Sequence, residues 1–226
     1  MQTDNSSKMN VRPTSTSPQN SCHDNPYRVV NVNDRDIYFN GGVTSDSMMD
    51  LVKELKHCER KRLIALKAVK RELKTARDKL KPEDIDHVDI GKISPQPINL
   101  HINSDGGSVF DVFFAVDEIK NLKVPVHTIV SGMAASAATI LSCAGTKRYI
   151  TKHAHMLIHE IRSGCWGKKS EIEEHFENTT KLSKLLLEYY KDATHMTTED
   201  LAEILKHDYY WDAAQCLEKG LVDEIM

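Results

Sequence analysis

The chain has 226 residues, 40% of them hydrophobic and 28% charged, so its length allows one substantial domain of a globular protein. A formal net charge of −3 gives no support for nucleic-acid binding by the chain as a whole. The five cysteines are widely spaced and form no CxxC pair, which argues against a zinc site and a disulfide framework. We therefore expect a cytoplasmic protein without a bound metal or cofactor.

Two segments bear on targeting and membranes. Residues 1–26 are rich in Ser, Thr, Asn and Gln and contain almost nothing apolar, so they are predicted to form a disordered tail. The same residues lack the apolar core of a secretory signal. Residues 126–145 approach the length of a membrane span, but their His, Thr and Ser side chains argue against one.

A single domain is expected over residues 27–226, and it opens with a short strand at 36–39 and a glycine turn. A long helix is predicted next, with Ser45 or Ser47 as its N-cap and Pro82 marking its end. Apolar residues in its second half recur every three or four positions, as in a coiled coil. Packing of this helix along its own domain is the alternative interpretation.

Charge is concentrated on this helix. Residues 53–81 contain 12 Lys/Arg and 4 Asp/Glu, a net of +8, which leaves the rest of the chain with a net of −11. We interpret a region at about 53–93 as a basic helical insertion. Such an arm predicts contact with an acidic neighbour, either its own subunit or a partner, in preference to a nucleic acid.

Strands and helices alternate from residue 98 onward, which is typical of an α/β domain with a largely parallel sheet. The predicted elements are a strand at 98–102, a helix at 109–122, a strand at 124–130, a helix within 135–145, strands at 147–151 and 154–159, and a helix at 169–194. A helix, a turn, a short helix and a strand-like end are predicted within 197–226.

Ser136 lies in the small-residue stretch "GMAASAA", after a strand and a glycine that is predicted to turn the chain. This order places Ser136 in the first turn of a helix, where backbone N–H groups are unpaired and favour a developing oxyanion. Small neighbours would let a substrate backbone come close to the hydroxyl. A buried serine on a tightly packed helix is the alternative interpretation.

A general base for this serine is available in His159, which follows an apolar strand, the position where α/β sheets commonly carry catalytic groups. Asp208, in "HDYYWD", could orient such a histidine. The pattern alone does not choose between these residues and their neighbours. The competing residues are His101, His127, His153 and His155 for the base, and Asp192, Asp200 and Asp212 for the carboxylate.

An ordered set of motifs resembles the proteolytic subunit of the Clp protease, a family of serine peptidases. The motifs are "INSDGGS", "GMAASAA", "AGTKRYI", "MLIHE", "RSGCWGKKSEIE" and "HDYYWDAAQCLEKGLVDEI", within residues 27–52 and 96–226. The resemblance implies an α/β, ClpP/crotonase-like fold of repeated strand–helix units with a handle helix. The handle would consist of a strand beginning near Gly164 and a helix at about 171–190, and its backbone edge would hold extended substrate.

The resemblance also assigns roles. Ser136 matches the family's catalytic serine, His159 its histidine and Asp208 its aspartate, while the backbone N–H groups of Gly107 and Ala137 match the oxyanion hole. It implies a serine endopeptidase of protein quality control that cleaves polypeptide substrates through an acyl-enzyme. The implied assembly is a homo-oligomeric ring, one heptamer or two, with an AAA+ ATPase unfoldase as a partner.

Departures from the family pattern bear on these partners. His101 replaces an aromatic residue on the surface where the ATPase docks, and His207 replaces a basic residue of the ring–ring contact. Both departures argue against docking of a standard unfoldase and against the usual double heptamer. Smaller departures leave the catalytic groups in place: Asp105 and Ile161 for proline, Ala138 for glycine and Glu160 for glutamine.

Three alternatives remain at this point. The chain could be a catalytically idle structural ring subunit, although such a subunit has no chemical reason to keep all three catalytic residues. It could be an acyl-CoA enzyme of the related crotonase fold, which would not explain Ser136 and His159 together. It could also be a viral version that processes capsid or scaffold proteins, with the basic insertion docking an acidic partner.

Overall fold

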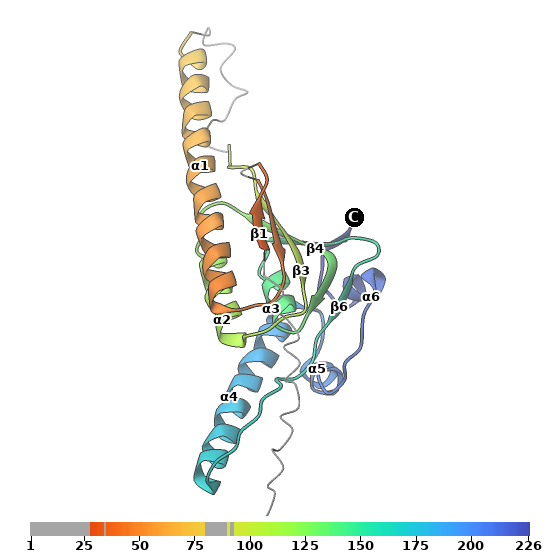
Figure 1. Ribbon diagram of the computed structural model, residues 1–226. Helices are drawn as coiled ribbons and strands as arrows, with labels where there is room; N and C mark the ends of the chain where they lie inside the picture. The colour runs from red at the N-terminus through yellow and green to blue at the C-terminus, as the bar shows by residue number, and fades with distance from the viewer. Residues whose placement is uncertain (1–27, 34, 80–89, 91–92) are drawn as a thin grey trace, which may run out of the picture.

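The computed structural model describes residues 28–33, 35–79, 90 and 93–226, and the predicted tail at 1–26 lies outside them. Its centre is a seven-stranded sheet with α1 and α2 along one face (Figure 1). The strands are β1 (Arg28–Asn31), β2 (Asp36–Asn40), β3 (Ile98–Ser104), β4 (Val126–Ala135), β5 (Lys147–Ile150), β6 (His155–Leu157) and β7 (Glu224–Ile225). The helices are α1 (Ser45–Arg77), α2 (Val109–Lys120), α3 (Ala137–Cys143), α4 (Lys169–Ala193), α5 (Thr198–Ile204) and α6 (Ala213–Glu218).

The strand order is β1-β2-β3-β4-β5-β7, and β6 pairs with the second half of β4. Every pairing is parallel except that of β1 with β2. Parallel strands need helical crossovers on the faces of the sheet, which accounts for the strand–helix alternation of the sequence. The predicted α/β fold with a largely parallel sheet is confirmed.

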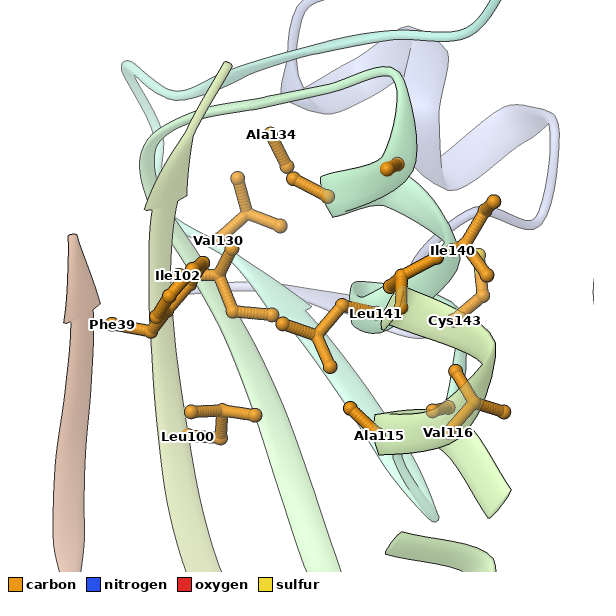
Figure 2. Packing of buried hydrophobic residues seen from close by; sticks show 14 of the residues in the cluster. Phe39, Leu100, Ile102, Ala115, Val116, Val130, Ala134, Ile140, Leu141 and Cys143 are labelled. Carbon is orange, nitrogen blue, oxygen red and sulfur yellow. The ribbon is translucent and has the colours of Figure 1, made fainter. Parts of the chain in front are cut away.

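Apolar side chains from the sheet meet α2 and α3 in a continuous core. In Figure 2, Leu100, Ile102 and Val130 from β3 and β4 point toward Leu141 of α3 and Ala115 of α2. All five side chains are fully buried. The small-residue stretch of the sequence therefore packs closely against the sheet on one side.

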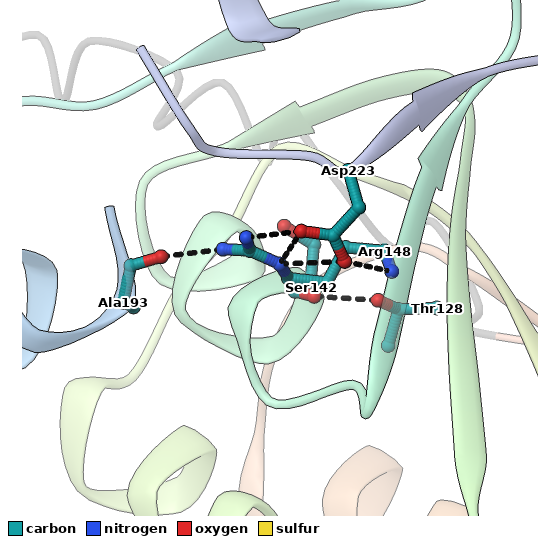
Figure 3. Close-up of polar contacts among 5 residues, drawn as sticks. All are labelled: Thr128, Ser142, Arg148, Ala193 and Asp223. Carbon is teal, nitrogen blue, oxygen red and sulfur yellow. Dashed lines mark hydrogen bonds and ion pairs between the residues drawn. The ribbon is translucent and has the colours of Figure 1, made fainter. Parts of the chain in front are cut away.

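Polar contacts join β4, β5 and the residue before β7 to helices α3 and α4 (Figure 3). The Arg148 guanidinium donates to Asp223 Oδ1 at 2.5 Å and to the carbonyl of Ala193, at the end of α4, also at 2.5 Å. The Thr128 hydroxyl of β4 donates at 2.6 Å to the Ser142 carbonyl in the last turn of α3. These bonds satisfy groups that the helix ends would otherwise leave unpaired.

Helix α1 differs from the prediction at both ends. Its N-cap is Thr44, whose hydroxyl accepts from Ser47 N–H at 3.2 Å while Ser47 Oγ accepts from Thr44 N–H at 2.9 Å, so Ser47 is the capping partner and Ser45 is the first helical residue. The helix ends at Arg77, before the predicted end, and the insertion expected at about 53–93 stays a prediction. Pro82 lies outside the described residues.

Three strand predictions were also wrong. Strand β4 continues through Gly132 to Ala135, because the Asn103 side chain accepts from Met133 N–H at 3.1 Å and bridges a register shift with β3. Strand β1 was not expected. Residues 158–168, where the handle strand was expected, contain no strand in the described chain, because in one copy they have no neighbouring strand to pair with.

Across residues 28–33, 35–79, 90 and 93–226, every helix is too short or too polar to cross a bilayer.

Candidate active site

Ser136 connects β4 directly to α3, as the N-cap residue of that helix. Its backbone has φ 54° and ψ −127°, and no other non-glycine residue in the described ranges has a positive φ. Such a conformation costs about 1–3 kcal/mol and is found where function requires a strained backbone. The Ser136 side chain forms no capping hydrogen bond, so its Oγ is available for chemistry.

Two backbone amides near this hydroxyl are also available. The N–H of Ser136 itself is not one of them, because it donates to the Leu157 carbonyl at 2.8 Å. The N–H groups of Gly107 and Ala137 donate to no acceptor within the described part of the chain. Unpaired donors of this kind stabilise an oxyanion when they point at the oxygen that gains charge.

Gly106 and Gly107 bring the glycine turn against Ser136. A Cβ on Gly106 would lie 2.6 Å from the Ala135 carbonyl oxygen and 2.7 Å from Ser136 Cβ. A Cβ on Gly107 would lie 2.2 Å from the Val43 carbonyl oxygen. Both residues have positive φ, at 98° and 147°. Only glycine fits these two positions without moving the serine or the turn.

His159 is brought to the same edge of the sheet by strand register. Ala135, the last residue of β4, pairs with Leu157, the last residue of β6. Because the strands are parallel, Ser136 and His159 both follow the carboxyl ends of neighbouring strands. The sequence predicted His159 as the last residue of this strand. In the structure it lies two residues beyond the end of β6.

Asp208 reaches His159 through contacts on both of its sides. Glu160 N–H donates to the Leu205 carbonyl at 2.7 Å, and Met156 and Trp211 exchange backbone hydrogen bonds at 2.9 and 2.8 Å. The connection between α5 and α6 therefore runs alongside the chain that carries His159. As a result, His159 Nδ1 lies 3.4 Å from Asp208 Oδ1.

The carboxylate of Asp208 has a second partner, the guanidinium of Arg162, which donates to Oδ2. Burial lowers the pKa of His159 below its ordinary value of 6.5, and the positive charge of Arg162 lowers it further. The carboxylates of Asp208 and Glu160 oppose this change without cancelling it. The imidazole is therefore neutral at pH 7, the form in which it can accept a proton.

A cavity of about 380 Å³ lies over Ser136, and all five predicted site residues line it. These residues are Gly107, Ser136, Ala137, His159 and Asp208. Apolar side chains, among them Val109, Ile140 and Leu186, form much of the remaining wall. The competing residues are used elsewhere or lie outside this cavity: Asp200 and Asp212 cap helices, and His101 and His127 lie on strands β3 and β4.

One catalytic contact is not formed: among the described residues, no hydrogen bond joins Ser136 Oγ to His159. The sequence also gave no indication of two supporting groups. One is Arg162. The other is a pair of hydroxyls, in which Thr139 Oγ1 donates to the Ser136 carbonyl at 2.6 Å and lies 2.5 Å from the Tyr190 hydroxyl. A long-range contact of this kind has no local sequence signal.

No group of three or more His, Cys, Asp or Glu side chains in the described ranges is arranged to hold a metal ion.

Comparison with known proteins places the chain in one family. A family model described as Clp protease matches residues 91–226, a range that contains all five predicted site residues. The ATP-dependent Clp protease proteolytic subunit 1 of Chlamydia muridarum is 37% identical over 136 residues, which cover 58% of this chain and 70% of the relative.

Two further relatives agree with this match. Proteolytic subunit 1 of Shouchella clausii is 33% identical over 131 residues, covering 57% of this chain and 68% of that protein. Proteolytic subunit 2 of Synechococcus sp. strain CC9605 is 32% identical over 131 residues, covering 57% and 66%. The matched domain, the mostly parallel sheet and these relatives together show that the chain belongs to the Clp protease family.

Proposed function

We propose that this protein is a serine endopeptidase in which Ser136 is the nucleophile, His159 the general base and Asp208 the residue that orients the histidine. The observation that carries the proposal is the single cavity lined by these three side chains and by Gly107 and Ala137. Membership of the Clp protease family agrees with it. The apolar wall of the cavity favours cleavage beside an apolar side chain of the polypeptide substrate.

We assign a task to each group on the basis of this geometry. His159 Nδ1 faces Asp208, which leaves Nε2 to take the proton of Ser136 Oγ as the oxygen attacks the peptide carbonyl. The unpaired amides of Gly107 and Ala137 would receive the resulting oxyanion. His159 then returns the proton to the leaving amine, and water releases the acyl group from Ser136 by the same steps in reverse.

Substrate binding has to complete this arrangement. The 3.4 Å contact of His159 with Asp208 is long for a hydrogen bond, and Ser136 Oγ is not yet bonded to the imidazole. Catalytic hydrogen bonds of this kind often tighten only in the complex with substrate. A catalytically idle ring subunit, the second candidate, would show the same open arrangement without closing it on substrate binding.

Acylation distinguishes the two candidates. The purified protein is treated with a fluorophosphonate probe and, separately, with short fluorogenic peptides. The peptidase predicts labelling and hydrolysis that are both lost in Ser136→Ala and His159→Ala. A folded protein that neither reacts with the probe nor cleaves peptides would instead be an idle subunit. Equal labelling of wild type and Ser136→Ala would refute the assignment of the nucleophile.

The proposal includes assembly of several copies, as in a ring. Large apolar side chains are exposed on one copy: Trp166 is 98% exposed, Phe110 74% and Phe176 71%. Burying such side chains against a second copy removes apolar surface from water. Native mass spectrometry tests this directly, since a species of one chain with and without peptide would contradict it.

The surface around His101 argues against docking of a standard ATPase unfoldase. On the surface where the family resemblance places ATPase docking, the His101 ring stacks on Tyr38 with centroids 4.2 Å apart. His101 Nε2 lies 3.6 Å from the carboxylate of Asp36. This polar arrangement does not suit a partner that docks an apolar side chain. We therefore expect hydrolysis of short peptides without added nucleotide.

A further inference from the structure

The second half of α1 extends away from the body of the protein. Buried residues of this helix end at Cys58, and beyond it α1 runs past the sheet, at the opposite end of the molecule from α4 (Figure 1). The contact of Arg62 with the Gln96 carbonyl, at 3.0 Å, lies near the start of this extension. We call residues 60–79 the basic arm. The Clp protease match begins after it.

The basic arm carries nine Lys/Arg and only two Asp/Glu. Each of Lys67, Lys70, Arg71, Lys74 and Arg77 lies three or four positions from another of the five, so they form a stripe along one side of the helix. Like charges at these spacings destabilise a helix, and no carboxylate in the described ranges pairs with these five residues. The stripe therefore concentrates positive charge that suits a negatively charged partner.

The last four cations of the stripe surround a hollow. Lys70, Arg71, Lys74 and Arg77 line a cavity of about 330 Å³ together with Ile90. Apolar side chains are exposed on the same arm, with Ile64 68% and Val69 45% accessible. The arm therefore offers close positive charges beside aliphatic surface.

The chemistry of the arm favours a polypeptide over a nucleic acid. Residues 60–79 contain no aromatic side chain to stack on a base and no Asn or Gln to recognise one. The rest of the chain is acidic, so a long polyanion that extended beyond the arm would meet repulsion. A short acidic segment avoids this repulsion, and its apolar side chains can contact Ile64 and Val69.

We propose that the basic arm binds acidic segments of polypeptide substrates and so raises their rate of cleavage at the distant active site. The recruiting role rests on the proposed peptidase function, whereas binding to the arm does not. The two are tested separately for that reason.

Binding is measured by fluorescence anisotropy on full-length Ser136→Ala protein. The probes are labelled unstructured 20-residue peptides that are identical except for Glu, Gln or Lys at alternate positions. The arm variant combines Lys70→Gln, Arg71→Gln, Lys74→Gln and Arg77→Gln, since glutamine keeps the helix. The control variant, which loses the same charge from exposed sites outside the arm, combines Lys53→Gln, Lys123→Gln, Lys147→Gln and Lys152→Gln.

The proposal predicts that only the Glu peptide binds and that salt weakens its binding. The arm variant should bind it about tenfold more weakly, from four exposed charge pairs, while the control variant should stay within about twofold of the parent. In active protein, kcat/KM for a substrate carrying the Glu segment should fall similarly in the arm variant. Hydrolysis of a short neutral peptide should not change.

Equal binding of the Glu peptide by the arm and control variants would overturn the proposal. Tighter binding of a 20-base-pair DNA duplex than of the Glu peptide, lost in the arm variant, would overturn it in favour of a nucleic-acid surface. Binding that depends on the arm in a protein that cleaves no peptide would support the arm as a binding site and refute the peptidase.

Discussion

Substitution of Gly106 by alanine tests whether the glycine turn keeps the oxyanion donors in place. The added Cβ would lie 2.6 Å from the Ala135 carbonyl oxygen, 2.7 Å from Ser136 Cβ and 3.0 Å from the Ala137 nitrogen. All three atoms belong to the backbone or to the first side-chain atom, so none can rotate out of the way. The substitution must therefore displace the turn or the β4–α3 junction.

The expected effects differ in size for folding and for catalysis. Overlap in a packed region, together with a φ of 98° at Gly106, should lower the free energy of unfolding by about 1–3 kcal/mol. Displacement of the Ala137 N–H removes one of two oxyanion donors, a loss that lowers kcat about 10²- to 10³-fold. The protein should therefore remain folded at 25 °C while losing nearly all activity.

Peptide hydrolysis, fluorophosphonate labelling and urea denaturation measure these quantities. Gly42→Ala is the matched control, because a Cβ there would lie 3.8 Å from the Gly106 carbonyl oxygen, an ordinary contact. Activity of Gly106→Ala within about twofold of the Gly42→Ala control would refute the role given to these amides, since a donor loss of the size above could not be hidden.

Two further predictions concern the surroundings of Ser136. Because the pKa of His159 lies below 6.5, the fall of kcat/KM toward acid pH should occur below pH 6.5. Arg162→Gln removes one cause of the low pKa and should move this fall to higher pH, and coinciding pH profiles would contradict it. Tyr190→Phe removes the hydroxyl that contacts Thr139 and should cost about 1 kcal/mol of unfolding free energy in urea denaturation, with kcat changed less than about threefold.

The alternation of strands and helices was sufficient to predict the α/β fold, because each element carries its own hydrophobic pattern. Features set by distant partners were not predictable in this way. Strand β1 is defined by its pairing with β2, which its own residues do not indicate. The continuation of β4 through Gly132 depends on the side chain of Asn103. The handle strand near Gly164 was expected from resemblance alone, and one copy of the chain offers it no partner.

The predicted site residues differ in how far the sequence could identify them. Ser136 stands out locally, because small residues surround it, but its positive φ and its close approach to Gly106 have no local sequence signal. Asp208 had no local advantage over Asp200 or Asp212. Its place beside His159 comes from the backbone bonds that join residues 156 and 211, some fifty positions apart.

The two halves of the site are held by contacts of different strength, which separates the effects of mutation on folding and on chemistry. Ser136 and the neighbouring amides are fixed by backbone hydrogen bonds and by the buried hydroxyl of Tyr190. His159 and Asp208 meet at the rim, where the carboxylate is half exposed and shared with Arg162. Changes that move the glycine turn or the β4–α3 junction should therefore lower stability and activity together, whereas loss of the Tyr190 hydroxyl should lower mainly stability. Changes to the second should alter activity and its pH dependence while leaving stability nearly unchanged, because exposed ion pairs contribute little to folding.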